Sequence, residues 1–245
     1  MTEPAPTGQP ADVPSVPPRW GFGDVAITLV GSIVLGSAVA AVLLSLEDSG
    51  LDSPAAKAWF LDIGLVVPWL CLAGWPLYAA ARKGYGPVHD YGLRLTWRGA
   101  GIGVGCGVAA LLTASWTYSI QVSVTHHSFD SAVGGVANDV ASGSRGALVV
   151  LALCTAFGAP VVEELAFRGL TYGALRKMGQ PVVWSVLWTT VLFALFHFEP
   201  VRIPVLLVLG AWLGVARAVT GSTAASMVAH ATVTIPGALM ILSLG

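Results

Sequence analysis

The residues best suited to chemistry are ionisable side chains enclosed within long apolar runs. Glu163, Glu164 and Arg168 lie in the segment PVVEELAFRG, with apolar stretches on both sides. Inserting one charge into a bilayer costs about 2.5–3.5 kcal/mol or more, so intramembrane ionisable residues are candidates for function. Glu164 and Arg168 are four residues apart and share one helix face, which permits an ion pair. Glu163 points about 100° away and has no sequence-local cation, so this carboxylate is predicted to move protons.

Two histidines lie at comparable depth in later apolar runs. His197 closes one run, and His230 lies about eight residues into another, with Thr234 one turn further on. If residues 146–177 form one continuous helix, a rise of 1.5 Å per residue puts Glu163 and His197 roughly 20–24 Å from the cytoplasmic ends of their helices. The same arithmetic puts His230 at about 20 Å. Three helices can therefore present the glutamate and both histidines at one level of the membrane.

The composition indicates which elements position these residues. Of the 245 residues, 55% are apolar and 10% are charged, the net charge is −1 and the mean hydropathy is +0.76. Soluble domains carry roughly 25% charged residues, and binding nucleic acid by counterion release requires a basic excess that this sequence lacks. The chain is therefore predicted to be an all-α, polytopic transmembrane helix bundle with no nucleic-acid partner. About seven membrane spans are predicted, at residues 25–46, 58–81, 99–121, 146–164, 181–198, 203–217 and 222–244. The stretch 165–180 is either a helix extension or a reentrant or interfacial segment.

Composition and charge also predict the segments of the chain and its orientation in the membrane. Residues 1–20 are rich in proline and are predicted to be a disordered cytoplasmic tail. Residues 21–145 hold the N-terminal spans and an outer loop, and residues 146–245 hold the core that contains the candidate residues. Lysines and arginines flank the connections after the second and fourth spans, so the positive-inside rule predicts a cytoplasmic N-terminus and a C-terminus outside, in a bacterial cell membrane. Alternating glycines at 99–107 predict close helix packing rather than a phosphate loop.

The candidate residues form a pattern that resembles a known family. An EExxxR motif is followed by FxxxH and then by an element similar to HxxxN, each in a predicted membrane helix. Over about residues 146–240 this order resembles the CPBP family, which contains intramembrane proteases related to the CAAX-processing enzyme as well as bacteriocin-immunity proteins. The matching residues are Glu163, Glu164, Arg168, Phe193, His197, His230 and Thr234.

The resemblance implies a role for each motif residue. It implies that Glu163 is the general base and that His197 helps to hold the attacking water. It implies that Glu164 and Arg168 form an ion pair that organises the site, and that His230 donates a hydrogen bond to the oxyanion. The function predicted in this way is an intramembrane endopeptidase that hydrolyses a membrane-embedded or membrane-associated peptide or protein through a glutamate-activated water.

One position departs from the family pattern. Thr234 stands where the family has asparagine, and its hydroxyl has a shorter reach than an amide. Losing one oxyanion donor typically costs about 10²–10³ in kcat. The replacement therefore predicts a slow protease, a protease with shifted geometry, or a family member that no longer cleaves peptides.

Several alternatives stay open at the level of sequence. A zinc ion could be bound by Glu163, His197 and His230 with water as a fourth ligand, although no HExxH motif is present and metal-free catalysis is favoured. A non-proteolytic protein that binds a peptide toxin and confers immunity is consistent with the threonine. A proton-coupled transporter is consistent with intramembrane glutamate and histidine. The carboxylates could also form a buried pair that only fixes helix packing.

Overall fold

The chain folds into a helical bundle. The computed structural model describes residues 17–48, 53–129 and 131–245, so most of the predicted tail at 1–20 lies outside the described residues. Helices are the only regular elements in this part of the chain, which confirms the all-α prediction. The elements are α1 (Phe22–Asp48), α2 (Pro54–Val66), η1 (Leu70–Gly74), α3 (Trp75–Lys83), α4 (Pro87–Asp90), α5 (Trp97–Thr125), α6 (Ala132–Gly143), α7 (Arg145–Leu153), η2 (Cys154–Gly158), α8 (Ala159–Glu164), η3 (Leu165–Thr171), α9 (Tyr172–Lys177), α10 (Val182–Phe196), η4 (Pro200–Arg202), α11 (Ile203–Thr220) and α12 (Thr223–Leu242).

Six of the described helical segments are long and apolar enough to cross a membrane, so the chain is an integral membrane protein. The remaining predicted span, at residues 181–198, corresponds to α10, which is apolar but only 15 residues long. The predicted outer loop at 122–145 also contains a helix, α6. The six long segments are Phe22–Leu46, Pro54–Lys83, Trp97–Thr125, Arg145–Lys177, Pro200–Thr220 and Thr223–Leu242.

The segment Arg145–Lys177 is one continuous helix, so the undecided stretch after residue 164 is a helix extension. Two π-helical stretches, η2 and η3, interrupt its α-helical hydrogen bonding on either side of α8. The first stretch precedes Pro160, which lacks a backbone N–H and whose ring displaces the carbonyl four residues earlier. The second begins directly after Glu164. π-Helical turns are rare and occur frequently at functional sites.

Small residues allow α5 to pack closely on α12. A Cβ atom at Gly103 or Gly107 would lie 2.6 Å from the carbonyl oxygens of Ala225 and Ala229, respectively, so only glycine fits at these two positions. A Cβ atom at Gly105 would meet nothing within 4 Å, because this glycine faces away from α12. The prediction of close packing by the alternating glycines therefore holds for one face of α5.

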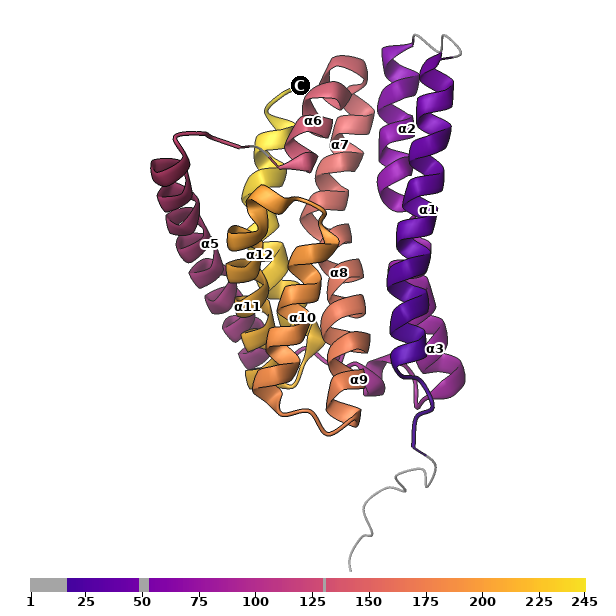
Figure 1. Ribbon diagram of the computed structural model, residues 1–245, viewed down its shortest axis with the longest axis vertical. Coiled ribbons are helices and arrows are strands. Elements are labelled where there is room, and N and C mark those ends of the chain that lie inside the picture. Colours follow the sequence, from indigo (N-terminus) through magenta and orange to yellow (C-terminus); the bar gives the residue numbers. More distant parts are fainter. Residues whose placement is uncertain (1–16, 49–52, 130) are drawn as a thin grey trace, which may run out of the picture.

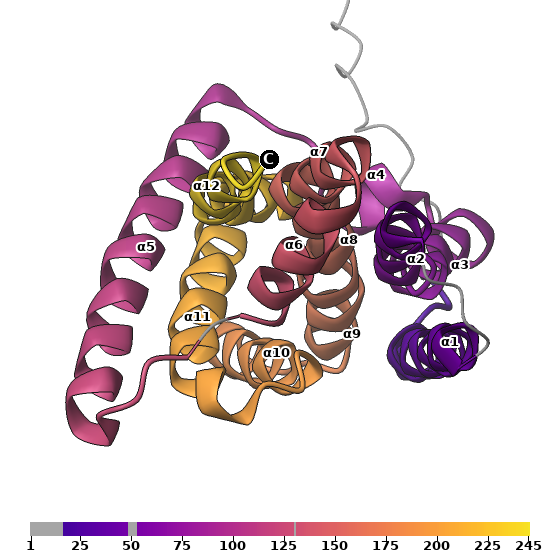
Figure 2. The ribbon, with the colours of Figure 1, turned by 90° about the horizontal axis from the view of Figure 1, so that it is seen from above.

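The helices form a core with two outlying parts (Figure 1). The α1–α3 region stands beside the long helix that contains α7, α8 and α9, and α5 leans away from the bundle on the opposite side. Seen from above, α6 covers the region between these parts (Figure 2). The C-terminus lies at the same end as α6, and α9 ends at the opposite, lower end. A cluster that includes Phe167, Phe193 and Leu213 forms the buried centre between α8–η3, α10 and α11.

Candidate active site

Glu164 and Arg168 form a fully buried ion pair. The Nη1 atom of Arg168 donates to Glu164 Oε1 at 3.0 Å, and neither side chain has any exposed surface. The Nη2 atom of Arg168 donates to the backbone carbonyl of Gly210 at 2.8 Å. The guanidinium carbon also lies 4.6 Å from the centroid of the Phe193 ring. Charges buried this completely are stable only when they are paired and hydrogen-bonded, so the pair fixes the packing of α8–η3 against α10 and α11.

His230 contacts both carboxylates of the EE pair. Its Nδ1 atom lies 3.1 Å from Glu164 Oε1, and its Nε2 atom lies 4.0 Å from Glu163 Oε2. A carboxylate paired with arginine accepts hydrogen bonds, so the Nδ1 atom carries a proton and donates it to Glu164. The Nε2 atom can then donate only when the ring is an imidazolium. This contact between residues 66 positions apart was not predicted from the sequence.

Glu163 lies between the two histidines. Its Oε2 atom is 3.9 Å from the Nε2 atom of His197 and 4.0 Å from that of His230. These distances are too long for direct hydrogen bonds and are of a length that a single bridging water can span. The side chains of Glu163 and His197 are 19% and 23% exposed, whereas that of Glu164 has no exposed surface. Glu163 is therefore the carboxylate that a small molecule can reach.

The FxxxH motif orients the His197 ring. The Nδ1 atom of His197 lies 2.7 Å from the carbonyl oxygen of Phe193, one turn earlier in α10. A carbonyl oxygen only accepts hydrogen bonds, so Nδ1 carries the proton, and in a neutral ring the Nε2 atom is an acceptor that faces Glu163. The ring also packs against the Phe193 ring, with 4.6 Å between centroids. Phe193 thus positions the histidine through both its backbone and its side chain.

Two further residues support the ion pair, and neither was predicted. A Cβ atom at Gly210 would lie 3.2 Å from side-chain atoms of Phe193 and Thr190, so glycine lets α11 approach α10 where Arg168 donates to its carbonyl. Thr223 Oγ1 lies 3.2 Å from the Arg168 carbonyl oxygen, within the π-helical stretch η3, and 2.5 Å from the Tyr91 carbonyl oxygen. A buried glycine and a helix-starting threonine occur in many membrane helices, so the sequence alone offers no signal for these roles.

Thr234 lies one turn beyond His230 on α12, and backbone carbonyls surround its hydroxyl. The Oγ1 atom is 3.2 Å from the carbonyl oxygen of His230 and 3.3 Å from that of Ala156. Ala156 lies four residues before Pro160, so its carbonyl has no i+4 backbone N–H to accept from. A hydroxyl has one hydrogen to donate, and in this arrangement Thr234 donates it to the backbone.

The three residues of the zinc alternative come together at Glu163, whose Oε2 atom lies 3.9 Å from His197 Nε2 and 4.0 Å from His230 Nε2. In the part of the chain that the structure describes, no group of three or more His, Cys, Asp or Glu side chains is arranged to hold a metal ion. Zinc ligands lie about 2.0–2.2 Å from the ion. Among the described residues, the Oε2 atom of Glu163 is buried and has no hydrogen-bond partner, so its capacity to accept a hydrogen bond is unused.

Comparison with protein families identifies the segment that contains this site. Residues 145–235 match the family model described as type II CAAX prenyl endopeptidase Rce1-like. The matched segment contains every motif residue from Glu163 to Thr234, and it confirms the family resemblance predicted from the sequence. No curated protein and no solved structure matches the chain.

Proposed function

We propose, on the basis of the Rce1-like domain at residues 145–235, that this chain is an intramembrane endopeptidase that hydrolyses a membrane-anchored peptide or protein. The observation that carries the proposal is the position of Glu163, a partly exposed carboxylate within 4.0 Å of two imidazole nitrogens. Its neighbour Glu164 is locked in an ion pair. A site with one free and one fixed carboxylate suits a general base supported by a rigid frame.

Glu163 and His197 are placed to activate one water molecule. Both present hydrogen-bond acceptors to the gap between them, so a water there donates one O–H to each. As its oxygen attacks the peptide carbonyl carbon, Glu163 takes one proton. The carboxylic acid formed then returns this proton to the leaving amine as the C–N bond breaks, which regenerates the carboxylate.

His230 supplies the charge that the tetrahedral intermediate needs. As an imidazolium, it donates from Nδ1 to Glu164 and from Nε2 to the developing oxyanion. Together with Arg168 it balances the two negative charges of the EE pair. Thr234 is the candidate second donor, provided that its hydroxyl rotates from the backbone carbonyls to the substrate. One such donor is typically worth about 10²–10³ in kcat.

Replacing the base tests the proposal. Glu163→Gln keeps the side-chain size and removes the proton acceptor, so hydrolysis of a membrane peptide should fall by about 10²–10⁴-fold or more. The matched control is Asp139→Asn, which likewise replaces a carboxylate by an amide but at an exposed position on α6. The control should keep wild-type activity, and thermal unfolding should show that both variants are folded. Wild-type turnover by Glu163→Gln would remove this residue from the mechanism.

A chelation experiment distinguishes metal-free catalysis from the zinc alternative. Metal-free catalysis predicts that activity survives a strong chelator and that purified, active protein holds no stoichiometric zinc by elemental analysis. One zinc per active chain, lost together with activity and restored with it, would instead assign Glu163, His197 and His230 as ligands.

Separate measurements test the two non-proteolytic functions, toxin immunity and proton-coupled transport. If the wild-type protein hydrolyses nothing across a broad panel of membrane peptides but binds a peptide toxin tightly, the immunity function takes precedence. A proton-coupled transporter would instead carry protons across vesicle membranes, and Glu163→Gln would abolish the flux.

A further inference from the structure

The helix that carries His197 stops part-way across the membrane. The 15 residues of α10 rise about 22 Å, whereas the hydrocarbon layer is about 30 Å thick. The neighbouring helix Arg145–Lys177 has 33 residues and rises about 50 Å. Figure 1 shows that the hairpin of α10 and α11 ends well below the top of α7 and α12. His197 follows the last residue of α10, so it lies at the upper end of this short hairpin.

On the lower side of Glu163, packed protein closes the site. From Glu164 to Leu175 every residue of the long helix except Gly173 is buried. Side chains of α10, including Ser185 and Thr189, are buried at the same levels. The exposed surface of Glu163 and His197 is therefore reached from the upper half of the bundle.

The tip of the hairpin between α10 and α11 combines two exposed apolar side chains with an ion pair that is about one-fifth exposed. Phe198 and Val201 are 68% and 57% exposed, and Arg202 Nη1 donates to Glu199 Oε2 at 2.6 Å. Non-helical backbone and an ion pair at membrane depth require protein or a water-filled space around them. Gln121 of α5 donates to the Val201 carbonyl, and the ion pair keeps about one-fifth of its side-chain surface exposed. That exposed part requires water at this level, which reaches it from the upper side.

A cavity lies in the same half of the molecule. It has a volume of about 470 Å³ and lies between α5, α11 and α12. Tyr118 and Ser119 contribute to it from α5, Arg202 from η4, Val205 from the first turn of α11, and Val233 from α12, one turn above His230. Its lining combines apolar side chains with hydroxyls and one cation, a mixture that suits an amphipathic peptide segment.

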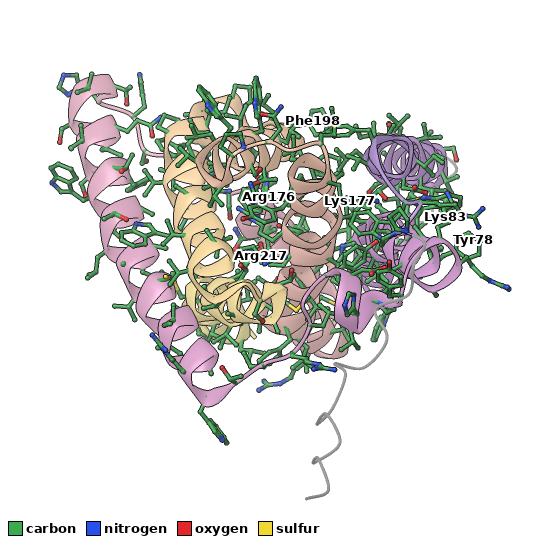
Figure 3. The ribbon with its side chains drawn as sticks, turned by 90° about the horizontal axis from the view of Figure 1, so that it is seen from below. Tyr78, Lys83, Arg176, Lys177, Phe198 and Arg217 are labelled. Atoms are coloured by element: carbon green, nitrogen blue, oxygen red, sulfur yellow. The ribbon has the colours of Figure 1, made fainter. Side chains whose placement is uncertain are left out.

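The cations identify the upper half as the non-cytoplasmic side. Of the twelve lysines and arginines, one is the buried Arg168, and only Lys57, Arg145 and Arg202 belong to the upper half. Figure 3 views the lower end and shows Lys83, Arg176, Lys177 and Arg217 there. Cytoplasmic connections carry the excess of lysine and arginine. The eight cations of the lower half are Arg19, Arg82, Lys83, Arg94, Arg98, Arg176, Lys177 and Arg217.

From these observations we infer that the site opens to the non-cytoplasmic side of the membrane. The substrate class is then a membrane-anchored peptide or protein whose scissile bond lies in or beyond the outer half of the bilayer, not one presented from the cytoplasm. The substrate part of this inference rests on the proposed endopeptidase activity. The direction of the opening rests on the structure and charge alone.

Accessibility of single cysteines tests the direction of the opening. Cys71, Cys106 and Cys154 are replaced by alanine, and Val201→Cys or Met178→Cys is added in turn. A membrane-impermeant maleimide should label Val201→Cys in intact spheroplasts. Met178, 65% exposed at the turn after α9, is the matched control and should be labelled only in inside-out vesicles. The reverse pattern would overturn the inference, and so would Val201→Cys that neither preparation labels.

A pair of tethered substrates tests the substrate class. The same peptide is fused to one membrane anchor in two orientations, so that it lies outside or inside the cell. Cleavage that depends on Glu163 should occur only with the peptide outside. Cleavage of the inside version alone or of both would overturn the inference while supporting a protease. Expected labelling with neither substrate cleaved would count against the endopeptidase, and the direction of the opening would stand.

Discussion

The two glutamates of the EE pair are adjacent in sequence, yet their surroundings share little. Glu164 lies with Arg168 and the Gly210 carbonyl in a closed layer that has no access to solvent. Glu163 and His197 form an open layer just above it, with about a fifth of each side chain exposed. His230 contacts both layers through its two ring nitrogens. The difference suggests that one layer holds the helices in place and the other carries out the chemistry.

The largest expected effect on stability comes from the closed layer. Arg168→Ala leaves Glu164 buried without its partner, which should lower the free energy of unfolding by about 3–5 kcal/mol. Activity should fall with it, because His230 loses a fixed neighbour. Thermal unfolding and expression level measure the effect, and the exposed Arg176→Ala should change stability by no more than about 0.5 kcal/mol. A fully stable and active Arg168→Ala protein would show that the closed layer has no structural role.

Variants of the two histidines should show different effects for the open and the closed layer. His197→Ala removes a residue of the open layer alone, so it should lower kcat strongly and leave stability nearly unchanged. His230→Ala should lower kcat by about 10²–10³-fold and also cost about 1.5–3 kcal/mol of stability, the typical contribution of a hydrogen bond to a charged group. Hydrolysis rates and unfolding curves of both variants provide the comparison. Equal stability losses in the two variants would contradict the assignment of layers.

Much of the site follows from local sequence rules, and the rest depends on packing. The i,i+4 spacing predicted the pair of Glu164 and Arg168, and helix rise placed Glu163 and His230 near one level; the structure contains both arrangements. The catalytic roles of these residues stay predictions. The bond from Glu164 to His230 joins residues far apart in the chain, so it depends on the angle at which two helices meet.

The number of membrane spans was also only partly predictable from the sequence. The apolar pattern predicted each of the six long helical segments and the helix over 181–198, because side chains that face lipid or the protein core are apolar. It did not predict α6, which lies in the predicted outer loop. Hydropathy does not show how far a helix extends into the membrane, and α10 is too short to cross the hydrocarbon layer. The end of this helix depends on Phe198 at φ 53°, outside the right-handed helical region, and on Pro200 two residues later.

A smaller effect is expected where α12 is held against α5. Gly107→Ala would bring a methyl group within 2.6 Å of the Ala229 carbonyl and displace the turn that carries His230. The variant should lose about 1–3 kcal/mol of stability and part of its activity. Gly105→Ala, on the open face of the same helix, should be neutral or more stable by up to about 1 kcal/mol. If both variants behaved alike in unfolding experiments, close packing would not be what positions His230.

The smallest expected effect concerns Thr234. Its hydroxyl donates to the backbone, so Thr234→Val should change kcat little if the hydroxyl does not reach the oxyanion. Thr234→Asn should raise kcat more than it lowers KM if the longer amide does reach it, with an upper limit of about 2.7–4 kcal/mol in transition-state stabilisation. Rates of the wild type and both variants on one membrane peptide decide this. Equal rates for all three would remove this position from the oxyanion site.

The π-helical stretch η3 has a consequence for how this helix tolerates changes in length. Each residue of a helix turns the chain by about 100°, so a stretch wound with i→i+5 bonds sets the residues below it out of phase with those above. In addition, the side-chain hydroxyl of Thr171 donates to the carbonyl of Ala166, five residues earlier. Deleting one residue between 165 and 171 would allow ordinary α-helix but rotate Tyr172 and Lys177 away from their contacts. The EExxxR segment therefore tolerates substitutions at its surface more readily than any change in its length.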